Sequence, residues 1–195
     1  SPFTYITPPN ITSISQLTGS TAGGTNVTIT GTNFTGATSV TFDGLAATSL
    51  SVVNSTTITC ITPARTTAGA VGIIVTTGGG PSSAFSSFTY ITPPNITGIL
   101  PSSGSTAGGT SVTITGTNFT GATSVTFDGI AATSLTIVNS TTITCSTPAR
   151  SAGAVDIIVT TDGGPSDAFS SFNYIIPPVI TSISPSYGST LGGTS

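Results

Sequence analysis

Residues 19–44 read GSTAGGTNVTITGTNFTGATSVTFDG, and residues 104–129 repeat this stretch almost letter for letter. A third copy begins at Gly188 and runs to Ser195. Repetition over so long a period is typical of a chain that strings together several copies of one structural unit. We therefore expect the sequence to say more about architecture than about chemistry.

The repeat has a period of 85 residues, which separates Asp43 from Asp128 and Cys60 from Cys145. The period shortens by one residue after Arg65, where the sequence TTAG becomes SAG in the second copy. A deletion of this kind is tolerated in a loop, so we place a loop there.

The repeat predicts where the structural units begin and end. We expect two complete repeats, residues 8–92 and 93–176. Residues 1–7 then correspond to the last strand of a preceding repeat, and residues 177–195 to the first strand and turn of a following one. Because the chain does not begin with Met, we interpret it as a window on a longer array.

Charged side chains are scarce, and this excludes several classes of function. They make up 4% of the chain, as two Arg and five Asp with no Lys, Glu or His. No Ser-His-Asp, Cys-His or paired-Glu arrangement can be assembled, so we predict a protein that is not an enzyme and has no cofactor. Two cations cannot neutralise a phosphate backbone, which argues against nucleic acid as a partner. No apolar run reaches the roughly 18–20 residues that a membrane-spanning helix needs, so we expect no membrane insertion in this segment.

Alternating apolar and polar residues predict short strands throughout each repeat. In residues 26–30 the alternation places Val27 and Ile29 on one face, and residues 39–43 continue it up to the hairpin signal Asp43-Gly44. Phe34 lies in the intervening loop, and we expect it to close the end of the core. The predicted core residues, each with a partner one period later, are Val27, Ile29, Val40, Phe42, Ile58, Cys60, Ile73, Val75 and Phe88.

The predicted fold class is all-β, with about seven strands in each repeat forming a β-sandwich. The evidence is a turn signal every 8 to 12 residues and the absence of any helical period. Pro93-Pro94 and Pro177-Pro178 leave almost no linker between successive repeats, and Pro-Pro is a stiff extended spacer. We therefore expect the sandwiches to be joined end to end.

A family resemblance rests on several motifs in fixed order. They are Pro-x-Ile-x-x-Ile, Gly-Gly-Thr-x-Val-Thr-Ile-Thr-Gly-x-Asn-Phe, Val-x-Phe-x-Gly, Thr-x-Ile-x-Cys-x-Thr-Pro-Ala and a closing Phe-x-Tyr. In this respect the chain resembles the IPT/TIG domain family, over both full repeats and both fragments. The resemblance implies tandem immunoglobulin-like, early-set sandwiches of the kind found in receptor ectodomains, bacterial and viral surface proteins, some transcription factors and some carbohydrate-active enzymes. It also implies a second Cys after the Phe-x-Gly turn, where this chain has Ala47 and Ala132.

Cys60 and Cys145 are therefore predicted to be unpaired thiols. Each has the strand parity of a core-facing Ile two residues earlier, which favours a small buried hydrophobe over an inter-chain disulfide. The chain has no His and no Cys-x-x-Cys spacing, so we predict no zinc site.

The remaining charged residues have structural interpretations and one weaker alternative. Asp43 and Asp128 precede Gly in a hairpin, where a carboxylate can accept main-chain hydrogen bonds. Arg65 and Arg150 occupy equivalent positions, and we expect each to form an ion pair or to bind neighbouring carbonyls. Three further carboxylates could contribute to a calcium site, but they occur in the second repeat alone and lack the Asp-x-Asp-x-Asp spacing; they are Asp156, Asp162 and Asp167. We predict no metal.

Seven Asn residues stand in Asn-x-Ser/Thr sequons and are candidate N-glycosylation sites. Sequons arise easily in a chain so rich in Ser and Thr, so the alternative of no glycan stays open. The candidates are Asn10, Asn26, Asn33, Asn54, Asn95, Asn118 and Asn139.

Two functions from different classes fit these observations. The first is a non-enzymatic structural repeat of a long extracellular or virion-surface fibre, filament or stalk, with other copies of the same chain as partners. Outward strand positions that are nearly all Thr, Ser or Gly leave sheet edges without the usual charged protection, which favours self-association or a cover of glycans. The alternative is an adhesin or receptor-binding repeat that recognises a glycan or a surface protein. That alternative is weakened because there is no Trp, and because Tyr5, Tyr90 and Tyr174 lie on closing strands.

Overall fold

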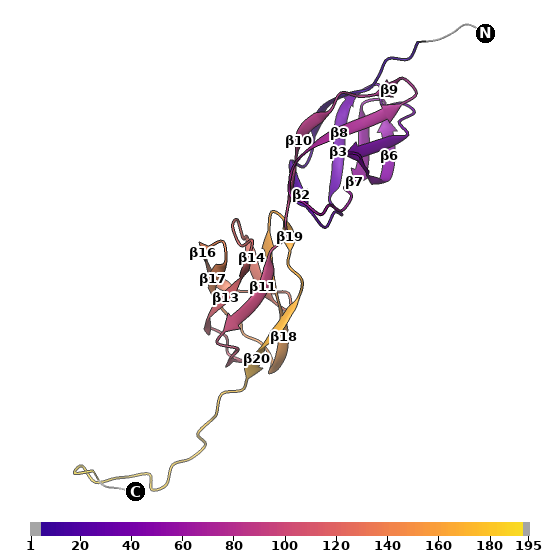
Figure 1. The fold of residues 1–195 in the computed structure, drawn as a ribbon. Helices are drawn as coiled ribbons and strands as arrows, with labels where there is room; N and C mark the ends of the chain where they lie inside the picture. The colour runs from indigo at the N-terminus through magenta and orange to yellow at the C-terminus, as the bar shows by residue number, and fades with distance from the viewer. Residues whose placement is uncertain (1–4, 193–195) are drawn as a thin grey trace.

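A computed structural model describes residues 5–192 and has two β-sandwiches arranged end to end (Figure 1). The first contains β1 (Asn10–Ile14), β2 (Thr18–Ser20), β3 (Asn26–Thr32), β4 (Ser39–Phe42), β5 (Leu45–Ala46), β6 (Thr48–Asn54), β7 (Thr57–Ile61), β8 (Gly69–Thr77), β9 (Gly80–Pro81) and β10 (Phe85–Ile91). The second contains β11 (Asn95–Leu100), β12 (Ser103–Ser105), β13 (Ser111–Thr117), β14 (Ser124–Phe127), β15 (Ile130–Ala131), β16 (Thr133–Asn139), β17 (Thr142–Ser146), β18 (Gly153–Thr161), β19 (Gly164–Pro165) and β20 (Phe169–Ile175). No helix capable of spanning a membrane occurs within residues 5–192.

Each sandwich packs a four-stranded sheet against a six-stranded one. The four-stranded sheet has the order β1-β3-β7-β6, and the six-stranded sheet has the order β2-β10-β8-β4-β5 with β9 paired to β8. The second sandwich repeats both orders, as β11-β13-β17-β16 and β12-β20-β18-β14-β15 with β19 on β18. This arrangement confirms the predicted fold class of tandem all-β sandwiches.

The strand register explains why the alternating residues form one core. Val27 pairs with Cys60 and Ile29 with Ile58 in the first sheet, so both pairs present their side chains to the same face. In the facing sheet, Phe42 pairs with Ile73. All nine predicted core residues and their nine partners are buried, which confirms the predicted core. Phe34 and its partner Phe119 are also fully buried, as expected for residues that close the end of the sandwich.

Three aromatic rings stabilise the centre of each core through edge-to-face contacts. The Phe88 ring lies 5.4 Å from Phe42 and 5.1 Å from Tyr90, measured between centroids. The corresponding rings of the second repeat, Phe127, Phe172 and Tyr174, have the same spacings. Edge-to-face packing aligns the positive edge of one ring with the negative face of another, which adds to the gain from burial.

Seven longer strands in each repeat match the expected number. Three short strands add to them, which in the first repeat are β2, β5 and β9. One of the short strands is β2, which contains Gly19 and pairs in parallel with β10. The polar sequence Thr-Gly-Ser gives no strand pattern. Gly19 suits this position because a Cβ there would lie 2.7 Å from the Phe88 ring.

The two terminal fragments contain no strand among their described residues, which are 5–7 and 177–192. Residues 1–4 and 193–195, included in the same prediction, lie outside the described part of the chain. The expected turn does form: the Gly192 N–H donates to the Ser189 carbonyl, as Gly23 does to Ser20 in the first repeat. A strand needs a hydrogen-bonding neighbour, whereas this turn is stabilised by its own residues.

Candidate functional site

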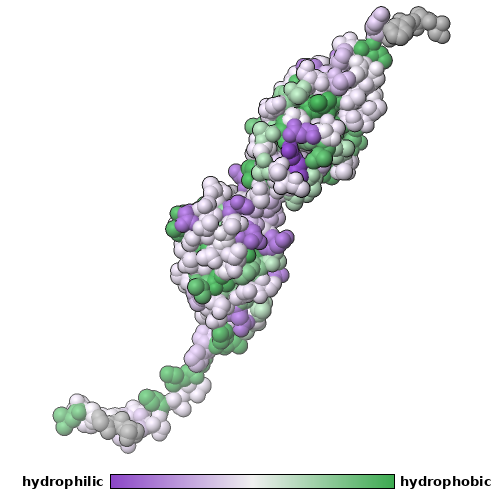
Figure 2. Space-filling view, in the orientation of Figure 1, coloured by the Kyte–Doolittle hydropathy of each residue, from purple (hydrophilic) through white to green (hydrophobic). Residues whose placement is uncertain are grey.

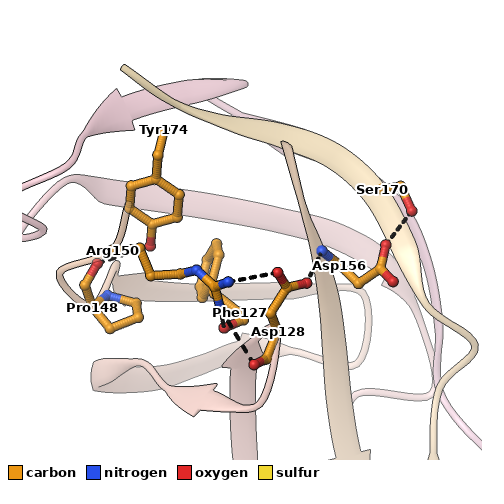
Figure 3. Close-up of polar contacts among 7 residues, drawn as sticks. All are labelled: Phe127, Asp128, Pro148, Arg150, Asp156, Ser170 and Tyr174. Carbon is orange, nitrogen blue, oxygen red and sulfur yellow. Dashed lines mark hydrogen bonds and ion pairs between the residues drawn. The ribbon is translucent and has the colours of Figure 1, made fainter. Parts of the chain in front are cut away.

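Three charged residues of the second repeat, Asp128, Arg150 and Asp156, gather at one corner of the sandwich (Figure 3). Arg150 follows β17, and Asp128 lies in the hairpin between β14 and β15; their side chains form an ion pair of 2.7 Å. The guanidinium of Arg150 also donates to the Phe127 carbonyl, at 3.0 Å. On its other side, the Asp128 carboxylate accepts the N–H of Asp156, whose own carboxylate accepts a hydrogen bond from the Ser170 hydroxyl. The side chains of Arg150, Asp128, Asp156 and Tyr174 each have at least one hydrogen-bond or ion-pair partner within the repeat.

The first repeat builds the same corner with one carboxylate fewer. Arg65 forms an ion pair of 2.9 Å with Asp43, and the other oxygen of Asp43 accepts the Gly72 N–H at 2.8 Å. The Gly72 N–H, and then Arg65, hold the pKa of the Asp43 carboxyl below its ordinary value. These contacts bear out the structural interpretation of the hairpin Asp and of the repeated Arg.

A buried tyrosine completes each corner. The Tyr90 hydroxyl donates to the Pro63 carbonyl at 2.9 Å, and the Arg65 guanidinium lies 5.5 Å from the centroid of its ring. Tyr174 donates to Pro148 in the same way, at 2.8 Å. Burial raises the pKa of both phenols. Because these rings lie inside the sandwiches, they present no aromatic platform to a ligand such as a sugar.

The chemistry available at this corner is structural. The ion pairs attach the segment after β7 or β17 to a hairpin of the opposite sheet. No group of three or more His, Cys, Asp or Glu that could hold a metal occurs in the part of the chain that the structure describes. Asp162 and Asp167, the other residues considered for calcium, are exposed, and neither takes part in the contacts of Asp128 and Asp156 described above.

The thiols lie in the core. Cys60 and Cys145 are free and buried, and burial raises the pKa of each thiol to about 11. A thiol with so high a pKa is almost entirely protonated at neutral pH and is therefore a poor nucleophile. Ala47 and Ala132, which replace the second Cys implied by the family resemblance, pack partly buried against the same cores.

The seven sequon asparagines are all exposed, but their amides differ in what they bind. Asn33 and Asn118 have positive φ values of 61° and 60°, and each donates its Nδ2 to a proline carbonyl, of Pro8 and Pro93 respectively. Asn54 instead accepts hydrogen bonds through Oδ1 from the N–H and hydroxyl of Thr56, and Asn139 does the same with Thr141. The proline contacts connect each sandwich to the segment that precedes it.

The sequence matches the IPT/TIG domain family twice, over residues 9–90 and 94–174. The chain belongs to the IPT/TIG domain family. Human Fibrocystin-L is 32% identical over 197 residues, an alignment that covers 94% of this chain and 4% of Fibrocystin-L. The plexin A4 full extracellular region, domains 1 to 10, has 25% identity and a TM-score of 0.52, over 93% of this chain and 17% of that one. A second plexin A4 structure, with domains 1 to 8, gives a TM-score of 0.50, also at 25% identity, over 88% of this chain and 18% of that one.

Sequence reasoning missed two contacts that recur in both IPT/TIG repeats. One is the Tyr hydroxyl bond to the proline after β7 or β17, and the other is the Asn bond to the proline that precedes β1 or β11. Both join residues more than 20 positions apart, so no local pattern identifies the partners. The recurrence of Asn before a buried Phe in both repeats was an available signal, but the sequon offered another interpretation of the same residue.

Proposed function

We propose that this chain is a non-enzymatic structural module of an extracellular or surface-exposed fibre, filament or stalk, and that copies of it associate side by side. Support for the location comes from the plexin A4 likeness, since the matched structures are of an extracellular region. Support for a structural role comes from the charged corners, which are satisfied within each repeat, and from the repetition itself. Lateral association is argued from the strands at the sheet edges.

The observation that carries the proposal is an uncharged, partly apolar edge that recurs in both repeats. β6 pairs with β7 alone and β5 with β4 alone, so both are edge strands, and they follow each other directly in the chain. Their exposed apolar side chains include Leu45 and Val53, and those of β15 and β16 include Ile130 and Val138. Val53 is 58% exposed and Val138 56%. None of these four strands contains a charged residue.

Such an edge is unusual in a protein that stays monomeric. Edge strands are commonly protected by Lys, Pro or covering segments, and soluble surfaces commonly carry charge on about a quarter or more of their residues. Here most of the surface has intermediate hydropathy, with a few strongly hydrophilic residues and scattered apolar ones (Figure 2). Register shifts within β6, at Thr48/Ser51 and Val52/Asn54, interrupt its regular geometry. We therefore expect copies to meet through side chains such as Val53 more than through an unbroken ladder of main-chain hydrogen bonds.

Glycans are a compatible addition to this proposal, and the structure ranks the candidate sites. At Asn54 and Asn139 the bonds to the following Thr use Oδ1, which leaves Nδ2 available for attachment. At Asn33 and Asn118 a glycan would lie beside the bond from Nδ2 to proline. We expect peptide mass spectrometry of the chain secreted from a eukaryotic host to find higher occupancy at Asn54 and Asn139.

The test of lateral association uses the unglycosylated chain and sedimentation velocity at rising concentration. We expect the sedimentation coefficient to increase with concentration. The double variant Val53→Lys with Val138→Lys should remain monomeric, because charge on both edges opposes their contact. A matched control, Thr12→Lys with Thr97→Lys, adds the same charge to exposed positions on β1 and β11, and it should associate like the original chain. A monomeric original chain at the highest concentration would contradict the proposal.

A further inference from the structure

The joint between the repeats consists of residues 92–94, which connect β10 to β11. On one side this segment meets the turn between β18 and β19 of the second repeat. A Cβ placed on Gly163 would lie 2.7 Å from the Thr92 carbonyl oxygen and 3.0 Å from a methyl carbon of Ile91. The φ of Gly163 is not in the left-handed region, so its own backbone would accept a side chain. The joint itself is what excludes a larger residue there.

On the other side the segment is held by an asparagine of the same repeat. Asn118, in the loop after β13, donates its Nδ2 to the Pro93 carbonyl at 3.1 Å. Asn118 has a φ of 60°, in the left-handed region of backbone conformation, which Asn adopts more readily than most residues. The second repeat thus approaches the segment from two separate loops: Asn118 donates to the Pro93 carbonyl, and Gly163 leaves no room for a Cβ beside the Thr92 carbonyl.

The same pair of contacts exists at the head of the first repeat. A Cβ on Gly79 would lie 2.7 Å from the Thr7 carbonyl oxygen, and Asn33 donates to the Pro8 carbonyl at 3.1 Å. Residues 5–7 have no strand before the first repeat, so these contacts form with the short segment alone. Each repeat therefore makes these Gly and Asn contacts itself, and they do not require a complete sandwich in front of it.

A complete preceding sandwich adds further contacts at the joint. A Cβ on Gly164 would lie 3.6 Å from the Ser20 Cβ of the first repeat, whereas one on Gly80 would have no neighbour within 4 Å. Ile91 is only partly exposed at the joint, while its equivalent Ile175, which no folded repeat follows among the described residues, is 51% exposed. Apolar surface on the closing strand is thus covered by the next repeat.

We propose that the Gly and Asn of each repeat form a binding site for the short segment that joins it to the preceding copy, and that this site holds neighbouring repeats in one orientation. The ligand is an extended segment ending in Pro: the Asn amide donates to the Pro carbonyl, and the missing side chain of Gly leaves room for the main chain before it. Recognition of the main chain explains why the segment can vary from Ile-Thr-Pro at residues 6–8 and 91–93 to Ile-Ile-Pro at 175–177. The inference goes beyond the proposed function, because it concerns the order of repeats within one chain and holds whether or not chains associate laterally.

The test measures distances between the repeats in the whole chain. Spin labels on Thr12→Cys and Thr97→Cys, exposed positions on β1 and β11, report the distance distribution by double electron–electron resonance. The native thiols are buried, and a chain without the added cysteines checks that they stay unlabelled. Samples are diluted until sedimentation shows monomers, so that lateral association does not contribute. We expect one narrow distribution for the original joint.

Two matched pairs of variants separate an effect on the joint from general effects of mutation: Gly163→Ala with Gly79→Ala, and Asn118→Asp with Asn33→Asp. Gly163→Ala should broaden or displace the distance distribution by steric exclusion of the joint. Asn118→Asp should do so because the amide donor is lost. Gly79→Ala and Asn33→Asp make the same changes in the first repeat, whose contacts are with residues 7 and 8. These residues do not lie between the two labels, so the distance distribution should be unchanged. Unfolding midpoints should show that all four variants fold. A broad distribution for the original chain, or equal responses within either matched pair, would overturn the proposal.

Discussion

The two repeats differ most informatively at the position that is Gly72 in the first and Asp156 in the second. In both, the main-chain N–H at this position donates to the carboxylate of the hairpin aspartate, Asp43 or Asp128. The added carboxylate of Asp156 accepts a hydrogen bond from Ser170 and leaves the strand pairing unchanged. The comparison indicates that the fold depends on the main-chain donor here, while the side chain is free to vary.

The largest effect is expected in the cores, where the repeats should respond alike. Phe42 and Phe127 are fully buried and make edge-to-face contacts with equivalent rings. Phe42→Ala and Phe127→Ala should each lower the free energy of unfolding of their own repeat by about 3–5 kcal/mol. Denaturant unfolding followed by circular dichroism should show two transitions in either variant. A loss below about 1 kcal/mol in one repeat would show that its ring lies outside a packed core.

A smaller effect is expected where a buried hydroxyl reaches across the sandwich. Tyr90→Phe and Tyr174→Phe keep the ring but remove the bond to Pro63 or Pro148. The free energy of unfolding of each variant, measured in the same way, should fall by about 1 kcal/mol, because the proline carbonyl is left without its donor. As a control, Thr97→Ser, on an exposed position of β11, removes one methyl group and should have no measurable effect.

Periodicity predicted the cores because a two-residue alternation reports directly which face of a strand is buried. The same reasoning could not find β2, since Thr18, Gly19 and Ser20 carry no apolar pattern and form a strand only through pairing with β10. At the corner, the sequence predicted that Arg65 would form an ion pair or bind carbonyls, and the partner became visible only in the structure. The contacts at the joint could not be predicted, because they join a side chain to a main-chain oxygen and so leave no complementary residue in the sequence.

Acid should weaken the first repeat through the carboxylate of Asp43. The folded-state pKa of Asp43 lies below its ordinary value of 3.8, so the stability from its ionised form is present above that pH. It is lost as the pH falls from 3.8 through the folded pKa, because the unfolded chain then binds the proton first. Asp43→Asn should therefore flatten the fall in unfolding midpoint below pH 3.8. Equal slopes for Asp43→Asn and the original chain would contradict the prediction.

The smallest effect is expected from exchanging the residues that distinguish the two corners. A Cβ on Gly72 would lie 3.3 Å from the Ala84 Cβ, which is close, but the second repeat accommodates Asp156 beside the equivalent Ala168. Gly72→Asp should therefore fold, with the entropic gain from removing Gly opposed by repulsion between the new carboxylate and Asp43. We expect a net change within about 0.5 kcal/mol at neutral pH, measured by denaturant unfolding. The repulsion should raise the folded-state pKa of Asp43 towards its ordinary value and so reduce the stability that is lost below pH 3.8. The reciprocal Asp156→Gly variant keeps the main-chain donor to Asp128 and should cost about 0.5–1 kcal/mol, as Gly does within a strand. If Gly72→Asp instead cost more than about 2 kcal/mol, the side chain at this position would not be free to vary, and the repeats would differ in packing as well as in charge.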